Sequence, residues 1–259
     1  MSKQAVLNIS LSHLPYPLDL TNAAIHVWQA ALDRPIEWVE KFSPLLSADE
    51  QTRADRFRFQ HHQHRFIVSR GILRLLLASY LNTDPAELRF SYGPLGKPAL
   101  ANASHPQSAL PLNLSFNLTH SEGFALYAFT LDRPVGIDLE YLPPQRSIHE
   151  LARRFFSPRE YEVICALPPT QQQAAFLQIW TYKEAYLKAT GEGLTGLNQI
   201  EVILAELDEP TPAAFTIHNS AHRSLHWKIL RLQPPPGYVA ALAIEGNPGE
   251  LVSYHLTDP

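Results

Sequence analysis

The spacing of apolar and polar positions along the chain predicts a mixture of helices and strands. Residues 60–81 are predicted to form a long helix, in which the apolar block at 71–81, interrupted by Arg74, is typical of a core-facing helix. Just before this block, Ser47 and Glu50 have the spacing of a capping box, so we expect another helix to begin there. Residues 112–120 alternate in polarity and residues 124–131 are mostly apolar, with turn residues between them, which predicts two adjacent strands.

The second half of the chain carries a similar mixture. Residues 149–167 and 172–191 are predicted to be helical, and the latter helix should end at Gly191, a common C-terminal cap. Residues 23–32 carry mixed signals. Strands are predicted at 135–140, 215–219, 225–232 and 237–246. This mixture indicates the α+β class. The turn-like tripeptide at 132–134 predicts two subdomains, 1–132 and 133–259.

Composition narrows the classes of protein. The 259 residues are 45% hydrophobic and 18% charged, with a net charge of −4, which argues against wholesale binding to nucleic acid or to an anionic membrane. No apolar run reaches the roughly 18 residues of a membrane span, and the first residues do not have the pattern of a signal peptide. The single cysteine, Cys165, cannot form an intramolecular disulfide and is expected to be a buried small side chain. We therefore expect a cytoplasmic protein.

Two carboxylates lie in the predicted strand at 135–140. Side chains alternate in a strand, so Asp138 and Glu140 share one face while Ile137 and Leu139 point to the core. The Cα atoms of the two acids would be about 7 Å apart, close enough for both carboxylates to reach one cation. Oxygen ligands of this kind suit Mg²⁺ together with substrate phosphates. The alternative is an exposed, charged strand face with no ligand.

A third acid lies in the predicted helix at 172–191. Glu184 shares a helix face with Trp180, Leu187 and Lys188, so a charged side chain stands on an apolar face. Glu184 and Lys188 could form a surface ion pair four residues apart, which is the alternative to a site. Together with the strand acids, they predict a metal–phosphate site.

A group of basic residues occurs between positions 51 and 74, where a single acid, Asp55, accompanies six arginines: Arg53, Arg56, Arg58, Arg65, Arg70 and Arg74. Guanidinium groups suit phosphate oxygens, although a solvated helix face would have the same composition. Further on, Lys97 lies in a Gly-Lys-Pro loop, and His120 ends a predicted strand where it could point into a cleft or serve the structure alone.

Several stretches, taken in order, resemble the motifs of 4′-phosphopantetheinyl transferases. They are "YGPLGKP", "FNLTHS", "VGIDLE", "FSPREYE" and "WTYKEAYLKATGEGL". The surfactin-synthetase-activating class is the more similar one, with cyanobacterial and other bacterial members. The resemblance implies two similar α/β subdomains related by a pseudo-twofold, with coenzyme A in the cleft between them. It also implies transfer of the phosphopantetheine arm to a carrier-protein serine and release of adenosine 3′,5′-bisphosphate.

The resemblance also assigns residues by motif. Asp138, Glu140 and Glu184 would hold Mg²⁺; Lys188 and His120 would meet phosphate oxygens; Lys97 and Thr119 would line the nucleotide cleft; Arg53, Arg65 and Arg70 would contact the 3′-phosphate and the nearby nucleotide. Glu184 or a metal-activated water would take the serine proton. Two positions depart from the family pattern: Glu50 stands where a basic residue is common, and Thr119 replaces a serine.

The partners implied are coenzyme A and an apo carrier protein, which could be an acyl carrier of fatty-acid synthesis, a polyketide synthase domain or a peptidyl carrier. The two similar halves could complete one site, so a monomer is expected. Two other classes of function remain open from the residues themselves. One is a module that binds coenzyme A or a carrier without turnover, and the other is a metal-dependent nuclease, against which the net charge of −4 counts.

Overall fold

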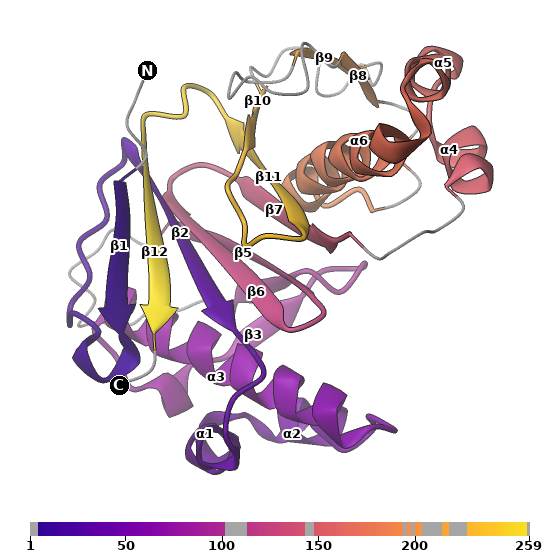
Figure 1. Ribbon diagram of the computed structural model, residues 1–259. Coiled ribbons are helices and arrows are strands. Elements are labelled where there is room, and N and C mark those ends of the chain that lie inside the picture. The colour runs from indigo at the N-terminus through magenta and orange to yellow at the C-terminus, as the bar shows by residue number, and fades with distance from the viewer. Residues whose placement is uncertain are drawn as a thin grey trace.

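Two β-sheets packed face to face form the centre of the molecule, and helices cover both outer faces (Figure 1). The structure is a computed structural model that describes residues 5–101, 113–142, 148–193, 196–197, 200–203, 214–217 and 227–257. One hydrophobic cluster lies under the helices of the first half, a second lies between the sheets, and a third lies under the helices of the second half. The order of layers is therefore helix, sheet, sheet, helix.

The two halves repeat one order of elements. The first half contains β2 (Ala24–Ala31), α1 (Ile36–Phe42), α2 (Ala48–Ala54), α3 (Gln60–Leu81), β3 (Phe90–Tyr92), β4 (Pro98–Leu100), β5 (Leu114–Ser121) and β6 (Phe124–Leu131). The second half contains β7 (Val135–Tyr141), α4 (His149–Phe155), α5 (Pro158–Ala166), α6 (Pro169–Thr190), β8 (Ile200–Ile203), β9 (Ala214–Ile217), β10 (Trp227–Arg231) and β11 (Tyr238–Glu245). The strand orders β2-β6-β5 and β7-β11-β10 match, with antiparallel pairing in both. This repeat is the expected α+β fold of two similar subdomains.

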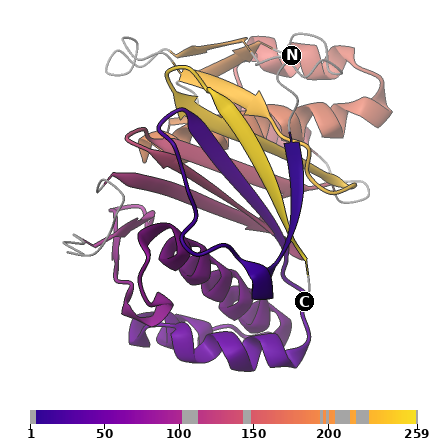
Figure 2. The ribbon, with the colours of Figure 1, turned by 90° about the vertical axis from the view of Figure 1, so that its left-hand side faces the viewer.

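Two terminal strands extend the sheet of the first half. They are β1 (Ala5–Ser10) and β12 (Glu250–Thr257), and the sheet order becomes β1-β12-β2-β6-β5. Strand β12 is parallel to both of its neighbours, so the end of the chain lies between two segments from its beginning (Figure 2). The predicted boundary between residues 132 and 133 stays a prediction. Strand β12 comes after this boundary in the sequence, but it pairs with strands that come before it.

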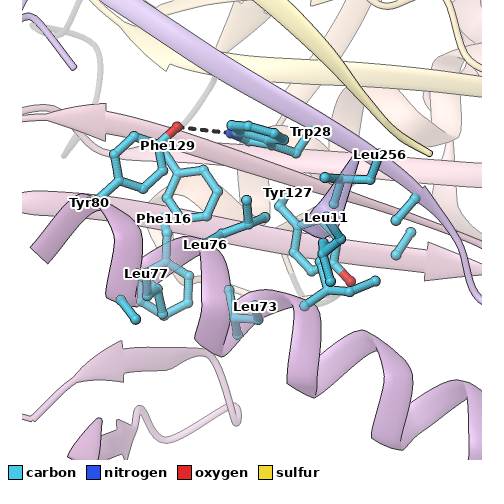
Figure 3. Close-up of a cluster of buried hydrophobic side chains, with 14 of the residues drawn as sticks. Leu11, Trp28, Leu73, Leu76, Leu77, Tyr80, Phe116, Tyr127, Phe129 and Leu256 are labelled. Atoms are coloured by element: carbon cyan, nitrogen blue, oxygen red, sulfur yellow. Dashed lines mark hydrogen bonds between the residues drawn. The ribbon is translucent and has the colours of Figure 1, made fainter. Parts of the chain in front are cut away.

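The core of the first half lies between α3 and the five-stranded sheet (Figure 3). Leu73, Leu76 and Leu77 of α3 face the aromatic residues of β5 and β6. One pair of buried polar groups in this core is satisfied internally, because the Trp28 indole N–H donates to the Tyr80 hydroxyl at 2.8 Å. The core thereby fixes β5, the strand that carries Thr119 and His120 to the junction with the second half.

Most of the predicted elements are confirmed. The helix expected at 60–81 is α3, and the capping box of Ser47 and Glu50 begins α2. The helix expected at 149–167 is instead two helices, α4 and α5. The break has a local cause, because Ser157 caps α5 and Pro158, which lacks a backbone N–H, occupies its first turn.

Strands account for the remaining differences. Residues 23–32, which carry mixed signals, contain β2, whereas β1 and β12 had no predicted counterpart. The strands expected at 215–219 and 225–232 are confirmed as β9 and β10 over part of their lengths. Positions 218–219 and 225–226 lie outside the described residues, as does 112 of the predicted 112–120 strand.

Two further expectations concern membrane-spanning helices and the burial of Cys165. No helix in the described part of the chain is long and apolar enough to cross a membrane. The prediction that Cys165 is buried is wrong: it lies exposed near the end of α5, and the neighbouring Ile164 fills the core position instead. Successive residues of a helix point about 100° apart, and in α5 the direction that faces the core is taken by Ile164.

Candidate active site

The predicted site residues meet where β5, β7 and α6 come together. Gly136 permits this meeting, because a Cβ atom at that position would lie 2.0 Å from the Ala185 carbonyl oxygen of α6. Ile137 and Leu139 face the core between the sheets, as predicted. The opposite face of β7 is covered by α6, and Asp138 is only 3% exposed. The alternative of a charged, solvent-exposed strand face is therefore wrong.

The Asp138 carboxylate forms an ion pair with a lysine and lies close to a threonine hydroxyl. The Lys188 ammonium Nζ lies 2.5 Å from Asp138 Oδ1 and also donates to Thr119 Oγ1 at 3.2 Å. The Thr119 hydroxyl is 3.4 Å from the same carboxylate oxygen. Three elements of the fold thus supply one compact polar cluster, in which the side chain of Lys188 remains 31% exposed and can reach a ligand.

Glu184 lies one helical turn before Lys188. Burial raises the pKa of the Glu184 carboxyl, the negative charge of Asp138 raises it further, and the Lys188 ammonium opposes both effects. Among the described residues, Oε1 of Glu184 and Oδ2 of Asp138 are buried and have no hydrogen-bond partner. Two buried acceptor oxygens that repel one another and lack donors suit a cation or a donor from a bound ligand.

The three predicted metal ligands are not gathered into a ready-made metal site. Across the described ranges, no three side chains of His, Cys, Asp or Glu are placed so that they could hold a metal ion together. Glu140 follows Asp138 on the same face of β7 and is partly buried. The structure therefore brings Asp138, Glu184 and Lys188 together, and Glu140 stands next to them along the strand.

His120 lies on the other face of β5, at the mouth of a hollow of about 190 Å³ that Arg65 and Phe66 also line. His120 is exposed as a residue, yet neighbouring groups partly desolvate its imidazole. This desolvation lowers the pKa of His120, and the positive charges of Lys188, Arg70, Arg53 and Arg65 lower it further. The ring is therefore held neutral at the centre of a group of cations.

Two of the predicted arginines lie near one aromatic ring of α3. The guanidinium carbon of Arg53 is 5.4 Å, and that of Arg70 5.8 Å, from the centroid of the Phe66 ring. Arg70 is 5% exposed, and its Nε lies 3.7 Å from Glu50 Oε1. Its Nη1 is buried without a hydrogen-bond partner. A buried, unsatisfied guanidinium donor is well suited to an anion.

Two other arginines of the basic group, Arg65 and Arg74, have partners within the protein. Arg65 forms a bidentate pair with Asp33, at 2.7 and 2.9 Å, and also contacts Glu122 at 3.3 Å. Arg74 is fully buried against Glu50, 2.7 Å away. The alternative of a solvated helix face is thus wrong for Arg70 and Arg74. Glu50, which departs from the family pattern, is the buried partner of these two arginines.

Lys97 contacts the end of α6. Its ammonium donates to the backbone carbonyls of Lys188, at 2.5 Å, and Ala189, at 3.1 Å. The last carbonyls of a helix lack partners within it, so a lysine here satisfies them and complements the helix dipole. Burial lowers the pKa of Lys97. The Gly-Lys-Pro loop of the first half is thereby tied to the helix that carries Glu184 and Lys188.

Known proteins resemble this chain over both of its halves. A family model described as "4'-phosphopantetheinyl transferase, N-terminal" matches residues 28–131, and one described as "4'-phosphopantetheinyl transferase superfamily" matches residues 134–243. The 4′-phosphopantetheinyl transferase HetI of Nostoc is 42% identical over 90% of this chain and 93% of its own length. The chain belongs to the 4′-phosphopantetheinyl transferase family. The enzyme therefore transfers the phosphopantetheine arm of coenzyme A to a carrier-protein serine, which sets aside the binding-module and nuclease interpretations.

More distant matches of the family were also found. The 4′-phosphopantetheinyl transferase Sfp of Bacillus subtilis is 31% identical over 63% of this chain and 69% of its own length. A putative 4′-phosphopantetheinyl transferase of Synechocystis is 36% identical over 67% of this chain and 68% of its own length. The solved acyl carrier protein synthase of Mycobacterium tuberculosis aligns with a TM-score of 0.31 at 19% identity, over 44% of this chain and 97% of that one. That score is too low to bear on the fold.

Two residues of this transferase escaped the sequence analysis although their motif was quoted. Asn117 and Ser121 of "FNLTHS" flank Thr119 at alternate positions on β5, and their side chains bind backbone N–H groups of β7. The available signal was the polar stripe at 117, 119 and 121, which the alternation of a strand places on one face. Nothing in the sequence indicated which segment would lie against that stripe.

Proposed function

We propose that the transferase reaction takes place at the junction of β5, β7 and α6, with Glu184, Lys188 and His120 in contact with the reacting groups. One observation carries this proposal. Asp138 and Glu184 present buried oxygens without partners among the described residues, beside the partly exposed side chain of Lys188. This combination of acceptors and a cation suits a diphosphate whose charge must be offset while a P–O bond breaks.

The phosphate groups of coenzyme A would be bound by the cations around His120. Lys188 and the neutral His120 would donate to oxygens of the diphosphate. Arg70, whose Nη1 lacks a partner among the described residues, and Arg53, which also lies near the Phe66 ring, would hold the 3′-phosphate. Arg65 is already held by Asp33 and Glu122, so its part would be to shape the hollow. Thr119 and Lys97 would line the cleft through their contacts with Lys188.

In the reaction, the hydroxyl oxygen of the carrier serine bonds to the β-phosphorus of coenzyme A. The bond from that phosphorus to the bridging oxygen breaks, and adenosine 3′,5′-bisphosphate leaves with the electron pair. The serine proton passes to the carboxylate of Glu184, which lies near Asp138 and the Lys188 ammonium. A water molecule as the acceptor is the alternative, and it would leave transfer nearly intact in a Glu184→Gln variant.

The donor set also fits Mg²⁺. Asp138 and Glu184 contribute oxygens without partners, and Glu140 adjoins them on β7, so these three residues would hold the ion. When bound, Mg²⁺ supplies positive charge that offsets the negative charge of the diphosphate. The Lys188 ammonium, which contacts Asp138 at 2.5 Å, would then be available to the substrate.

The names of the relatives identify the reaction, and the chemistry of that reaction requires a carrier protein as the acceptor. We propose apo acyl or peptidyl carrier proteins as acceptors, in fatty-acid, polyketide or peptide biosynthesis. We propose that the enzyme acts in the cytoplasm. It would act as a monomer, because the repeat of two halves places all the proposed groups on one chain.

The test is the intact mass of an apo acyl carrier protein after incubation with the enzyme, coenzyme A and Mg²⁺. The carrier should gain the mass of one phosphopantetheine group. Glu184→Gln should slow the transfer about a hundredfold or more, because a positioned base contributes at least that factor. Glu40→Gln, an exposed position on α1, is the matched control and should transfer at the normal rate. A chelator tests the requirement for the metal.

The outcomes separate the parts of the proposal. Full activity of both Glu184→Gln and Asp138→Asn would rule out this junction as the site. Full activity in the presence of chelator would rule out the metal alone. Calorimetric titration of coenzyme A with and without Mg²⁺ gives an independent measure, and Asp138→Asn should remove the difference between the two titrations.

A further inference from the structure

Strand β7 lies at the edge of its sheet, yet it is buried. In the three-stranded order β10-β11-β7, the far side of β7 has no neighbouring strand within that sheet. Backbone N–H groups on a buried edge need acceptors, because leaving them unpaired is costly. The surface that meets this edge belongs to β5, the last strand of the other sheet.

Side chains of β5 supply the hydrogen-bond acceptors that a neighbouring strand would otherwise offer to β7. Asn117 Oδ1 accepts the backbone N–H of Ile137 at 2.9 Å, and Ser121 Oγ accepts that of Tyr141 at 3.1 Å. The two acceptors are four residues apart on β5, and the two donors are four residues apart on β7. The two strands therefore run in the same direction and keep one register. Thr119 lies between them and approaches Asp138 at 3.4 Å.

The hydrogen bond from Ile137 to Asn117 holds β7 directly beside Asp138, the residue with a proposed role in the reaction. Ile137 directly precedes Asp138, and Asn117 is 4% exposed. On the other side of the strand, Gly136 lies against the backbone of α6 at a separation that leaves no room for a Cβ atom. Because β7 is held from both sides, the Asp138 carboxylate has little freedom to move relative to Lys188.

We propose that Asn117 is a positioning residue for phosphopantetheine transfer: its amide oxygen takes the place of a neighbouring strand, binds Ile137 and so fixes Asp138 against Lys188 and Glu184. This inference rests on the proposed role of Asp138. An asparagine suits the position, because its side-chain amide has the same acceptor group as the backbone it replaces. A leucine of similar size would leave the Ile137 N–H buried and unpaired.

The first experiment measures hydrogen exchange at single backbone amides by NMR, in the wild type and in Asn117→Ala. The Ile137 amide should exchange about tenfold faster or more in the variant, since a bond of this kind is lost. The Tyr141 amide, which Ser121 holds, should change much less. Ser79→Ala is the matched control: it removes another buried side-chain bond in the first half, from Ser79 to the Pro15 carbonyl, far from β7.

The second experiment measures transfer kinetics and Mg²⁺-dependent binding of coenzyme A in the same variants. Asn117→Ala should lower kcat about tenfold or more with little change in KM for the carrier, and should weaken the effect of Mg²⁺ on coenzyme A binding. Ser79→Ala should behave as the wild type in both. If Asn117→Ala does not fold, Asn117→Thr replaces it, because threonine suits a strand but is too short to reach Ile137.

Two results would overturn the inference. One is exchange at Ile137 that rises no more than in Ser79→Ala. The other is a kcat that stays at the wild-type value although the Ile137 amide exchanges faster. Asp138→Asn is measured in parallel. If that variant is inactive while Asn117→Ala is fully active, only the inference about Asn117 fails; if Asp138→Asn is itself active, the proposed site fails and this inference with it.

Discussion

Glu160 and Lys183 form a buried ion pair in the second half of the molecule, with Oε2 and Nζ 2.7 Å apart. Glu160 also accepts backbone N–H groups from Ser157 and Val202, both at 2.7 Å. The first half has the same device, because Glu50 is bound by Arg74 at 2.7 Å. In both halves the glutamate belongs to a capping box and the cation to the long helix that follows. The repeat of the fold thus extends to its buried charges.

This pair should be essential for stability. We expect Lys183→Met to lower the free energy of unfolding by about 3–5 kcal/mol, because it leaves the Glu160 carboxylate buried without a counter-charge. Urea unfolding of the wild type and the variant measures the loss. The double variant with Glu160→Gln should recover part of it, since no buried charge is then unpaired. A double variant less stable than Lys183→Met would contradict this explanation.

Gly136 should tolerate no side chain. Gly136→Ala would bring Cβ to 2.0 Å from the Ala185 carbonyl oxygen and 2.4 Å from the Ala189 nitrogen, and backbone cannot move aside as a flexible side chain can. We expect a loss of about 3 kcal/mol or more, together with loss of transfer. Gly93→Ala is the control, because its nearest contact would be an ordinary 3.8 Å. Equal stability of the two variants in thermal unfolding would show that β7 and α6 are not in this close contact.

Lys97 should act on α6 rather than on the nucleotide directly. Lys97→Met removes the bonds to the carbonyls of Lys188 and Ala189, and we expect a loss of about 1–2 kcal/mol of stability. Lys97→Arg keeps the charge and should recover part of the loss. Chemical unfolding and coenzyme A titration are measured side by side. Weaker binding with unchanged stability would mean instead that the ammonium contacts the nucleotide.

His26 should make the fold sensitive to acid. Burial lowers the pKa of His26 from 6.5 to about 4, opposed by the charge of Asp19, and its Nδ1 lies 2.7 Å from the Tyr80 hydroxyl. The folded state therefore binds this proton less readily than the unfolded state does. Stability is fully present above about pH 6.5 and falls as the pH is lowered toward 4, by up to about 3 kcal/mol.

The pH dependence is measured by urea unfolding at several values between neutral pH and pH 4. His26→Gln should flatten the part of the slope that comes from this residue. His13→Gln, at an exposed position, should leave the slope as it is in the wild type. A steep slope that persists in His26→Gln would assign the acid sensitivity to other groups.

Several elements could be predicted because their signals are local. The helix Gln60–Leu81 followed from a block of apolar residues, and the start of α2 from the capping box of Ser47 and Glu50. The strands β5, β6 and β7 followed from alternation and turns. The break between α4 and α5 was also marked locally, by Ser157 and Pro158, but the apolar pattern continued across it and hid it.

Other features could not be predicted, because they depend on segments that are distant in sequence. Strand β12 pairs with β1 and β2, more than 200 residues away, and no local pattern specifies that pairing. Arg70 and Arg74 had the composition of a basic surface, and only the packing of α2 against α3 gave them Glu50 as a buried partner. The role of Asn117 depended in the same way on the strand that lies beside it.

The sequence by itself determined most of the types of element, the family and the residues that carry charge at the site, because these follow from local spacing and from motifs. Only the tertiary structure decided which of those residues meet. Lys188 could pair with Glu184, four residues before it in the same helix, but its ammonium instead binds Asp138, fifty residues away in sequence. The close contact of Gly136 with α6 brings the carboxylate of Asp138 within reach, and a contact made through space leaves no mark in the spacing of residues along the chain.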